Sequence, residues 1–184
     1  TETEANIARA TDEYRAALRA DPAEEQSTRT LAELLYHTGR TEEAADLLTG
    51  FARTRALDPA LSLLLGKSLI RSGRFDEAET ILSGLIARSP KNLEAADALG
   101  ALYEYRKDYD KAIAVYTPFL KDSAQAGYLR VRIGSLHIQA KRFAEAIEQL
   151  TEARRIDPDD VRGLLALAEA YEGANRLEAA VGCY

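Results

Sequence analysis

The segment Leu99–Phe119 reads LGALYEYRKDYDKAIAVYTPF, and its apolar residues fall at helical spacing on both sides of a polar break at residues 106–108. Apolar positions that recur at intervals of three and four residues are typical of an amphipathic helix. The break between the two patterns is only long enough for a tight turn. The segment therefore predicts two helices that double back on each other.

The same pattern recurs every 34 residues along the chain. A small residue stands at the position of Gly100 in each repeat, and another at the position of Ala112. The first set continues with Ala32, Gly66, Gly134 and Ala168, and the second with Ala10, Ala44, Ala78, Ala146 and Ala180. A fixed period in this range is the signature of a repeat solenoid. The sequence therefore predicts an all-α array of helical hairpins.

The period divides the chain into a single array over 1–184. Full repeats are expected at 25–58, 59–92, 93–126 and 127–160, with a truncated repeat at 161–184. Residues 1–24 align with the second half of a repeat, so they form either a half repeat or an N-terminal cap helix. Thr1 and Glu4 have the spacing of a capping box at its start. Because the chain has no Met and its pattern stops within a helix, we expect a piece of a longer protein.

Each full repeat carries signals for a first helix, a turn and a second helix. The first helix has a large apolar residue just before its small one, namely Leu31, Leu65, Leu99 or Ile133. A left-handed residue is expected at the turn, where glycine fits freely and lysine costs about 1 kcal/mol. The turn positions are Gly39, Gly73, Lys107 and Lys141, and the last turn falls at Asn175. The second helices are expected to begin at Thr41, Phe75, Tyr109 and Phe143.

The small residues indicate how the two helices of a hairpin pack. The Gly or Ala of the first helix is expected to face the Ala twelve positions later, which lets the helix axes approach closely. The buried stripe of each second helix is expected to end at Phe51, Leu85, Phe119 or Ala153. Pro22, Pro90 and Pro158 end their helices because proline cannot continue the hydrogen-bond ladder. The second helices without such a proline are expected to run longer or to end differently.

Composition limits the possible partners and locations. The 184 residues are 46% hydrophobic and 29% charged, with a net charge of −6 and basic residues scattered among acidic ones. Nucleic acid is therefore disfavoured as a partner. Apolar runs are too short to span a membrane, so we expect no membrane insertion and a soluble protein of the cytoplasm or periplasm. The usage of Ala, Arg and Leu suggests a bacterial source.

The sequence contains none of the common catalytic patterns. It has no phosphate-binding glycine loop, no Cys-x-x-Cys pair and no Ser/His/Asp arrangement. His37 and His137 stand in different registers of the repeat, and His137 falls where other repeats carry core residues. Cys183 is single and excludes an internal disulfide. We therefore expect no enzyme activity and no catalytic, cofactor-binding or metal-ligating residue.

The pattern as a whole resembles the tetratricopeptide repeat (TPR) family. Residues 65–90 carry it clearly, with Leu65, Gly66, Leu69, Gly73, Phe75, Ala78, Leu82, Leu85 and Pro90 at matching positions. One departure is the large aromatic residue that the family often has early in the first helix. Here that position holds Thr28, Ser62, Ala96, Arg130 and Leu164, so lighter packing between neighbouring repeats is expected.

The resemblance implies a right-handed superhelical solenoid of antiparallel helical hairpins whose first helices line a concave groove. Such a groove binds a peptide or a partner protein. The groove residues carried over by register are Arg29, Glu33, Tyr36, His37, Leu63, Lys67, Ile70, Arg71, Glu94, Asp97, Ala101, Glu104, Tyr105, Tyr128, Val131, Ile138, Arg162, Leu165 and Glu169. For any one of them, a solvated helix face is the alternative reading.

The charges of these residues suggest the kind of partner. Basic residues dominate early in the row and acidic ones later, with tyrosine and aliphatic residues between them. This order favours a segment with an acidic end, an apolar middle and a basic end. The expected function is a non-catalytic protein-interaction scaffold. One alternative is the recognition or assembly arm of a larger enzyme or secretion complex, for example a glycosyltransferase or an outer-membrane exopolysaccharide export protein. The other is a module that forms homo-oligomers through uncapped ends.

Overall fold

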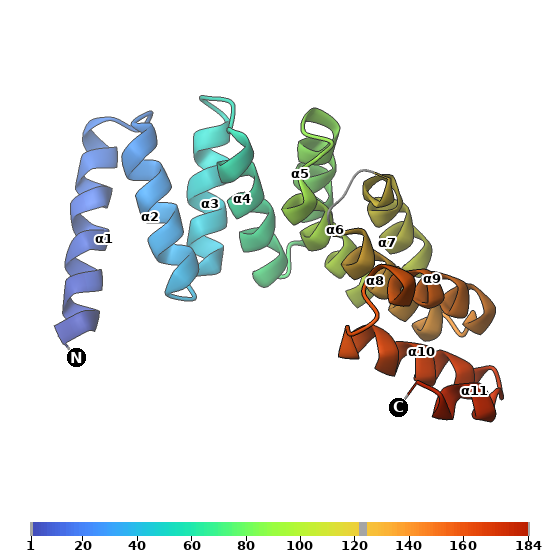
Figure 1. Cartoon of the computed structure of the whole chain (residues 1–184). Coiled ribbons are helices and arrows are strands. Elements are labelled where there is room, and N and C mark those ends of the chain that lie inside the picture. Colours follow the sequence, from blue (N-terminus) through green and yellow to red (C-terminus); the bar gives the residue numbers. More distant parts are fainter. Residues whose placement is uncertain (1, 122–124, 184) are drawn as a thin grey trace. The chain divides into compact units, whose positions relative to one another are not determined.

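The computed structural model describes residues 2–121 and 125–183, and all regular secondary structure in this part of the chain is helical (Figure 1). The chain divides into an N-terminal unit, Thr1–Ala98, and a C-terminal unit, Leu99–Tyr184. The all-α class and the helical hairpins are as expected. The prediction of a single array over the whole chain stays a prediction.

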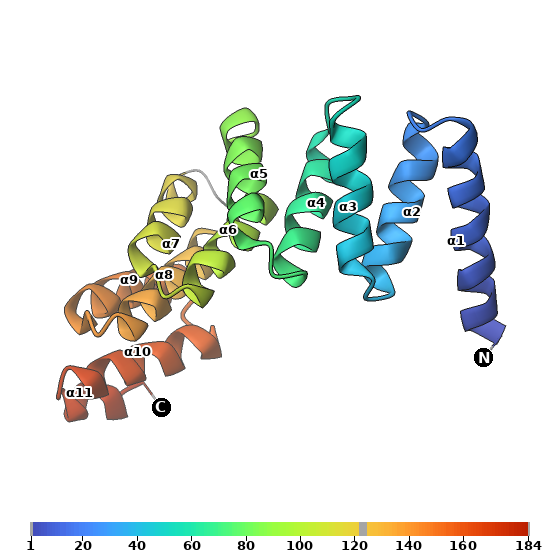
Figure 2. The same cartoon turned by 180° about the vertical axis from the view of Figure 1, so that it is seen from behind.

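The N-terminal unit contains five complete helices and the start of a sixth. They are α1 (Glu2–Ala20), α2 (Glu25–His37), α3 (Thr41–Ala52), α4 (Pro59–Arg71), α5 (Phe75–Arg88) and the first part of α6 (Leu93–Tyr105). The helices α2 and α3 pack together as one hairpin, and α4 and α5 as the next (Figures 1 and 2).

The C-terminal unit continues α6 and repeats the same arrangement. Its further elements are α7 (Tyr109–Tyr116), the 3₁₀ turn η1 (Thr117–Leu120), α8 (Ala126–Gln139), α9 (Phe143–Ile156), α10 (Val161–Gly173) and α11 (Leu177–Val181). The hairpin of α8 and α9 packs against α10. The predicted capping box of Thr1 and Glu4 lies outside the side chains that the structure describes.

The turns within hairpins have the left-handed backbone that the sequence predicts. The φ angles are 81° at Gly39 and 78° at Gly73, and 59° and 58° at Lys107 and Lys141. Asn175 has the same conformation at the last turn, with φ of 58°. The second helices begin directly afterwards, at the four residues expected. The two lysines therefore hold a conformation that costs a residue with a side chain about 1–2 kcal/mol.

The contact that joins the two helices of a hairpin differs from the expected one. A Cβ atom added to Gly66 would lie 2.5 Å from Cδ2 of Leu82, sixteen positions later, and one added to Gly134 would lie 2.5 Å from Cγ of Leu150. Gly100 has the same relation to Tyr116. Each glycine thus receives a large buried side chain of the second helix. The prediction that it faces the Ala twelve positions later is wrong in this respect.

The two second helices without a proline in the register of Pro90 end differently from the others, which is one of the two expected outcomes. In the C-terminal unit, α7 stops at Tyr116, and the chain continues through η1, where Phe119 is only half-buried. Pro118 explains this end, because its ring clashes with a helical carbonyl and it has no N–H to donate. In the N-terminal unit, α3 stops at Ala52 instead of running longer.

Arginines at the starts of second helices connect successive hairpins. Arg74, at the N-cap of α5, pairs with Asp46 of α3 at 2.6 Å. In the C-terminal unit, Arg142 at the N-cap of α9 pairs with Asp110 of α7 at the same distance. In each unit, an ion pair therefore joins one second helix to the next.

Candidate functional site

The predicted groove residues of the N-terminal unit lie on its first helices, and several of them bind one another. Arg29 of α2 pairs with Asp58, the N-cap of α4, at 2.6 Å and with Glu25 at 3.2 Å. Lys67 of α4 pairs with Glu94 of α6 at 3.6 Å. These charged groups link neighbouring first helices, so Arg29 in particular is already engaged within the chain.

An aromatic contact joins the other ends of α2 and α4. The guanidinium carbon of Arg71 lies 4.8 Å from the ring centroid of Tyr36, at a distance suited to a cation–π interaction. The Tyr36 ring also meets the edge of His37. Arg71 and His37 are exposed, as is Glu33, while Leu63, Ile70 and Asp97 are half-buried. This surface combines exposed cations with partly covered apolar groups.

In the C-terminal unit, Glu104 of α6 is held by two residues of α8. Its carboxylate accepts a hydrogen bond from Gln139 Nε2 at 2.6 Å and lies 3.4 Å from the Arg132 guanidinium. Arg132 also donates to the hydroxyl of the buried Tyr116 at 3.0 Å. Sequence reasoning missed Arg132. The sequence feature that could have revealed it is a charged residue at a position where the other repeats have Thr30, Leu64, Ala98 and Ala166.

Three predicted groove residues meet at one pocket between α8, α9 and α10. Tyr128, Val131 and Arg162 line a cavity of about 250 Å³, and Ile156 supplies an apolar wall. The Arg162 side chain is 74% exposed. Asp157 and Asp160 add carboxylates to the lining. The pocket thus offers apolar walls with charged groups of both signs around them.

Two glycines stand at this pocket, at positions where other repeats carry side chains. Gly127 stands where the other repeats have Glu25, Pro59, Leu93 and Val161, and Gly163 stands where they have Ser27, Leu61, Ala95 and Leu129. Both glycines line the pocket. A Cβ atom on Gly163 would lie 3.2 Å from Val131, and one on Gly127 would lie 3.3 Å from Ile156. Glycine at both positions therefore avoids these close contacts.

The remaining predicted residues lie on the same first helices. Ala101 and Tyr105 are exposed near the end of α6, Tyr105 to 73%. Ile138 is half-buried on α8, and Leu165 and Glu169 are exposed on α10. The structure thus groups Tyr128, Val131 and Arg162 in a pocket and leaves the others along the helix faces.

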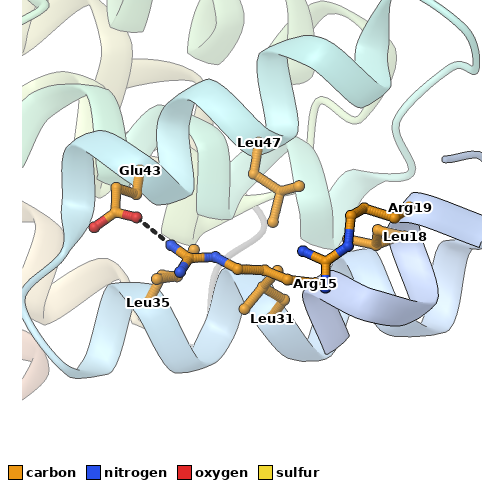
Figure 3. A pocket seen from close by; sticks show the side chains of 7 residues that line it. All are labelled: Arg15, Leu18, Arg19, Leu31, Leu35, Glu43 and Leu47. Atoms are coloured by element: carbon orange, nitrogen blue, oxygen red, sulfur yellow. Dashed lines mark hydrogen bonds and ion pairs between the residues drawn. The ribbon is translucent and has the colours of Figure 1, made fainter. Parts of the chain in front are cut away.

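A second pocket lies between α1 and the hairpin of α2 and α3, and sequence reasoning did not find it. Its volume is about 280 Å³, and its lining consists of Arg15, Leu18, Arg19, Leu31, Leu35, Glu43 and Leu47 (Figure 3). Each of these residues is ordinary in its own helix. Only the approach of three helices brings them together.

The two histidines lie in different units of the chain. His37 is exposed on α2, and His137 is half-buried on α8 in the other unit. Burial lowers the pKa of His137, and the nearby Arg142 cation lowers it further.

Across the residues that the structure describes, no group of three His, Cys, Asp or Glu side chains could hold a metal ion. Within the same residues, none of the helices combines the length and the apolar character that crossing a membrane requires.

Family models described as tetratricopeptide repeat match this chain at residues 4–59, 63–130, 105–166 and 137–183. BBSome complex member BBS4 of Bos taurus is 23% identical over 154 residues, which cover 84% of this chain and 30% of that protein. Protein O-mannosyl-transferase TMTC1 of Homo sapiens is 28% identical over 136 residues, which cover 72% of this chain and 15% of that protein. The chain thus spans less than a third of either relative.

Solved structures of MamA have a similar fold. MamA from Desulfovibrio magneticus RS-1 superposes with a TM-score of 0.74 at 20% identity, covering 89% of this chain and 91% of that one. A second MamA, from MSR-1, superposes with a TM-score of 0.66 at 26% identity, covering 85% of this chain and 90% of that one.

Proposed function

Since this chain belongs to the tetratricopeptide repeat family, we propose that it is a non-catalytic scaffold that binds a peptide or partner protein on its first helices. In the C-terminal unit the binding surface is the pocket of Tyr128, Val131 and Arg162. In the N-terminal unit it is the surface around Lys67, Ile70 and Arg71.

The pocket between α8, α9 and α10 carries the proposal. Predicted groove residues from α8 and α10 line one cavity, and Ile156 beside them is left 45% exposed. Exposed apolar groups rimmed by polar residues are typical of binding surfaces. An apolar side chain of the partner would enter between Val131 and Ile156, while its polar flanks would meet Arg162 and the two aspartates.

The charges suggest how a partner segment is recognised. Lys67 and Arg71 favour acidic residues in the part of the partner that contacts the N-terminal unit. Glu169 and the pocket aspartates favour basic residues in the part that contacts the C-terminal unit. Complementary charges of this kind mainly set the association rate and the specificity.

Affinity capture from the native lysate with the full chain tests the proposal, followed by competition with a peptide from the retained protein. The double variant Tyr128→Ala/Arg162→Glu should lose capture. The triple variant Lys67→Ala/Arg71→Ala/Tyr105→Ala should lose it as well. Arg155→Glu is the matched control, because Arg155 is 72% exposed on α9 and does not line the pocket. Undiminished capture by both groove variants would reject the groove.

A second candidate is that these repeats are the recognition arm of a larger protein or complex. The names of the two curated relatives support it, since one is a complex member and the other a transferase, and both extend far beyond the matched part. The reading frame around this segment would decide between a free scaffold and an arm.

Self-association is a third candidate, favoured by apolar residues on the last two helices. Val161 and Leu165 of α10 are 64% and 52% exposed, and Leu177 and Val181 of α11 are 60% and 73% exposed. Sedimentation at increasing concentrations should then show dimers that Leu177→Lys/Val181→Lys abolishes. A monomer at all concentrations would reject this candidate.

A further inference from the structure

The pocket between α1 and the hairpin of α2 and α3 lies apart from the proposed groove, and its lining is unusual for a surface depression. Leu18 of α1, Leu31 and Leu35 of α2 and Leu47 of α3 form its walls. Leu31 and Leu35 are buried core residues, while Leu18 and Leu47 are only partly covered. The pocket therefore opens directly onto the hydrophobic core of the first hairpin.

Two arginines from successive turns of α1 stand at this pocket. Arg15 donates to Glu43 of α3 at 2.6 Å, and Figure 3 shows its side chain running beside Leu31 and Leu35 toward that carboxylate. Arg19 lines the same space from the next turn (Figure 3). No carboxylate in the described part of the chain lies within ion-pair distance of Arg19. Like charges four residues apart on a helix repel each other.

Glu43 does not balance this positive charge, because another arginine already holds it. Arg40 donates to both of its oxygens, at 2.7 and 2.8 Å. These hydrogen bonds hold the pKa of Glu43 below its usual range, and Arg15 lowers it further. The carboxylate thus stays ionised and shared between two guanidinium groups. The excess charge at the pocket is positive.

From this arrangement we infer that the pocket is a docking site for an acidic segment of a partner protein, which inserts one leucine- or phenylalanine-sized side chain. The volume of 280 Å³ fits such a residue, since a cavity of about 150 Å³ holds a benzene molecule. A carboxylate next to the inserted residue pairs with Arg19 and separates the two like charges. The site uses none of the residues proposed for the groove. An experiment can therefore reject the docking site without rejecting the groove, and the reverse.

Methyl NMR of the full chain, with labelled leucines, tests the site with short capped peptides. A Glu-Leu-Glu peptide should shift the methyl signals of Leu18 and Leu47. Glu-Ala-Glu, which lacks the apolar anchor, and Lys-Leu-Lys, which has the wrong charge, should leave them in place. Equal shifts with all three peptides would overturn the proposal. Octanoate that moves these leucines where Glu-Leu-Glu does not would assign the pocket to a small amphiphile and overturn it as well.

Two variants and one control separate the charge from the cavity. Arg19→Ala should weaken the Glu-Leu-Glu peptide about fivefold, as expected for loss of one exposed ion pair. Leu18→Phe fills the pocket and should abolish the shift of Leu47. Arg9→Ala is the matched control, because Arg9 lies on the same helix, is 81% exposed and pairs with Glu13. Equal weakening by Arg9→Ala and Arg19→Ala would show general electrostatic attraction to α1 and reject the site.

Discussion

Replacing Gly66 by alanine should destabilise the first-to-second-helix packing of the hairpin formed by α4 and α5. The added Cβ atom would lie 2.5 Å from Cδ2 and 2.6 Å from Cγ of Leu82. Carbon atoms in favourable contact are about 3.5–4.0 Å apart, so one of the two groups must move by about 1 Å. Leu82 is fully buried and has no solvent to move into.

The size of the effect follows from two opposing contributions. Overpacking of this kind costs about 1–3 kcal/mol, and the buried partner places Gly66→Ala at the upper end. Alanine regains about 1 kcal/mol, because glycine is a poor helix former. The expected net loss is about 2 kcal/mol. Gly84→Ala is the matched control, since Gly84 lies in α5 with no atom within 4 Å of an added Cβ. That variant should gain about 1 kcal/mol.

Urea unfolding followed by far-ultraviolet circular dichroism measures both variants. The midpoint should fall for Gly66→Ala and rise for Gly84→Ala. A Leu82→Ala background removes the clashing atoms, so Gly66→Ala should there become neutral or stabilising. If Gly66→Ala matches Gly84→Ala in the wild-type background, or still destabilises beside Leu82→Ala, the contact with Leu82 is not what requires glycine.

Three further predictions concern backbone, protonation and charge. Lys107→Gly relieves a left-handed backbone and should stabilise by about 0.5 kcal/mol in urea unfolding, whereas Lys111→Gly within α7 should cost about 1 kcal/mol. The lowered pKa of His137 favours its neutral ring in the folded state. Its stabilising contribution is complete above the ordinary pKa of about 6.5 and is lost as pH falls through the lowered folded value. His137→Gln should flatten the pH dependence of the unfolding midpoint below about pH 6.5. Arg74→Gln should cost at most about 1 kcal/mol in low salt and less at about 1 M salt.

Each of these predictions has an outcome that contradicts it. Equal losses for Lys107→Gly and Lys111→Gly would mean that the turn stores no strain. An unchanged pH profile in His137→Gln would show that the ring does not titrate with folding. A loss in Arg74→Gln that persists in high salt would point to packing of the long side chain, not to its charge.

The start of each second helix could be predicted to the residue, because the signals are local. A left-handed turn residue and acidic side chains in the following turn mark the position whatever the helix packs against. The ends were harder to predict. Phe119 has the register of a core residue, but Pro118 beside it stops α7, and a local constraint prevails over the periodic pattern.

The glycine contacts show what spacing alone leaves out. The register predicts that Gly66 faces Ala78, but the atoms nearest to a Cβ atom on Gly66 belong to Leu82. Helical side chains lean toward the N-terminus of their helix. Leu82, one turn beyond Ala78, therefore leans back over the place where Gly66 has no side chain.

For the candidate site, register predicted which residues lie on first helices but not what each of them binds. Tyr128, Val131 and Arg162 share a pocket whose lining also includes Gly127 and Gly163. Arg29 instead pairs with Asp58, whose position at the next helix start depends on how hairpins stack. No sequence motif marks the pocket of Figure 3, because its residues come from three helices and none of them is unusual in its own helix.

The contact of Gly66 with Leu82 joins two positions of the same 34-residue repeat, and so does that of Gly134 with Leu150. A duplicated stretch of gene that encodes a whole repeat would therefore inherit both partners together, already matched. Arrays of this kind can lengthen or shorten by whole repeats while every hairpin keeps its fit. Recombination within the turn at Gly73 would instead pair a glycine with a foreign second helix, and selection would have to match them again.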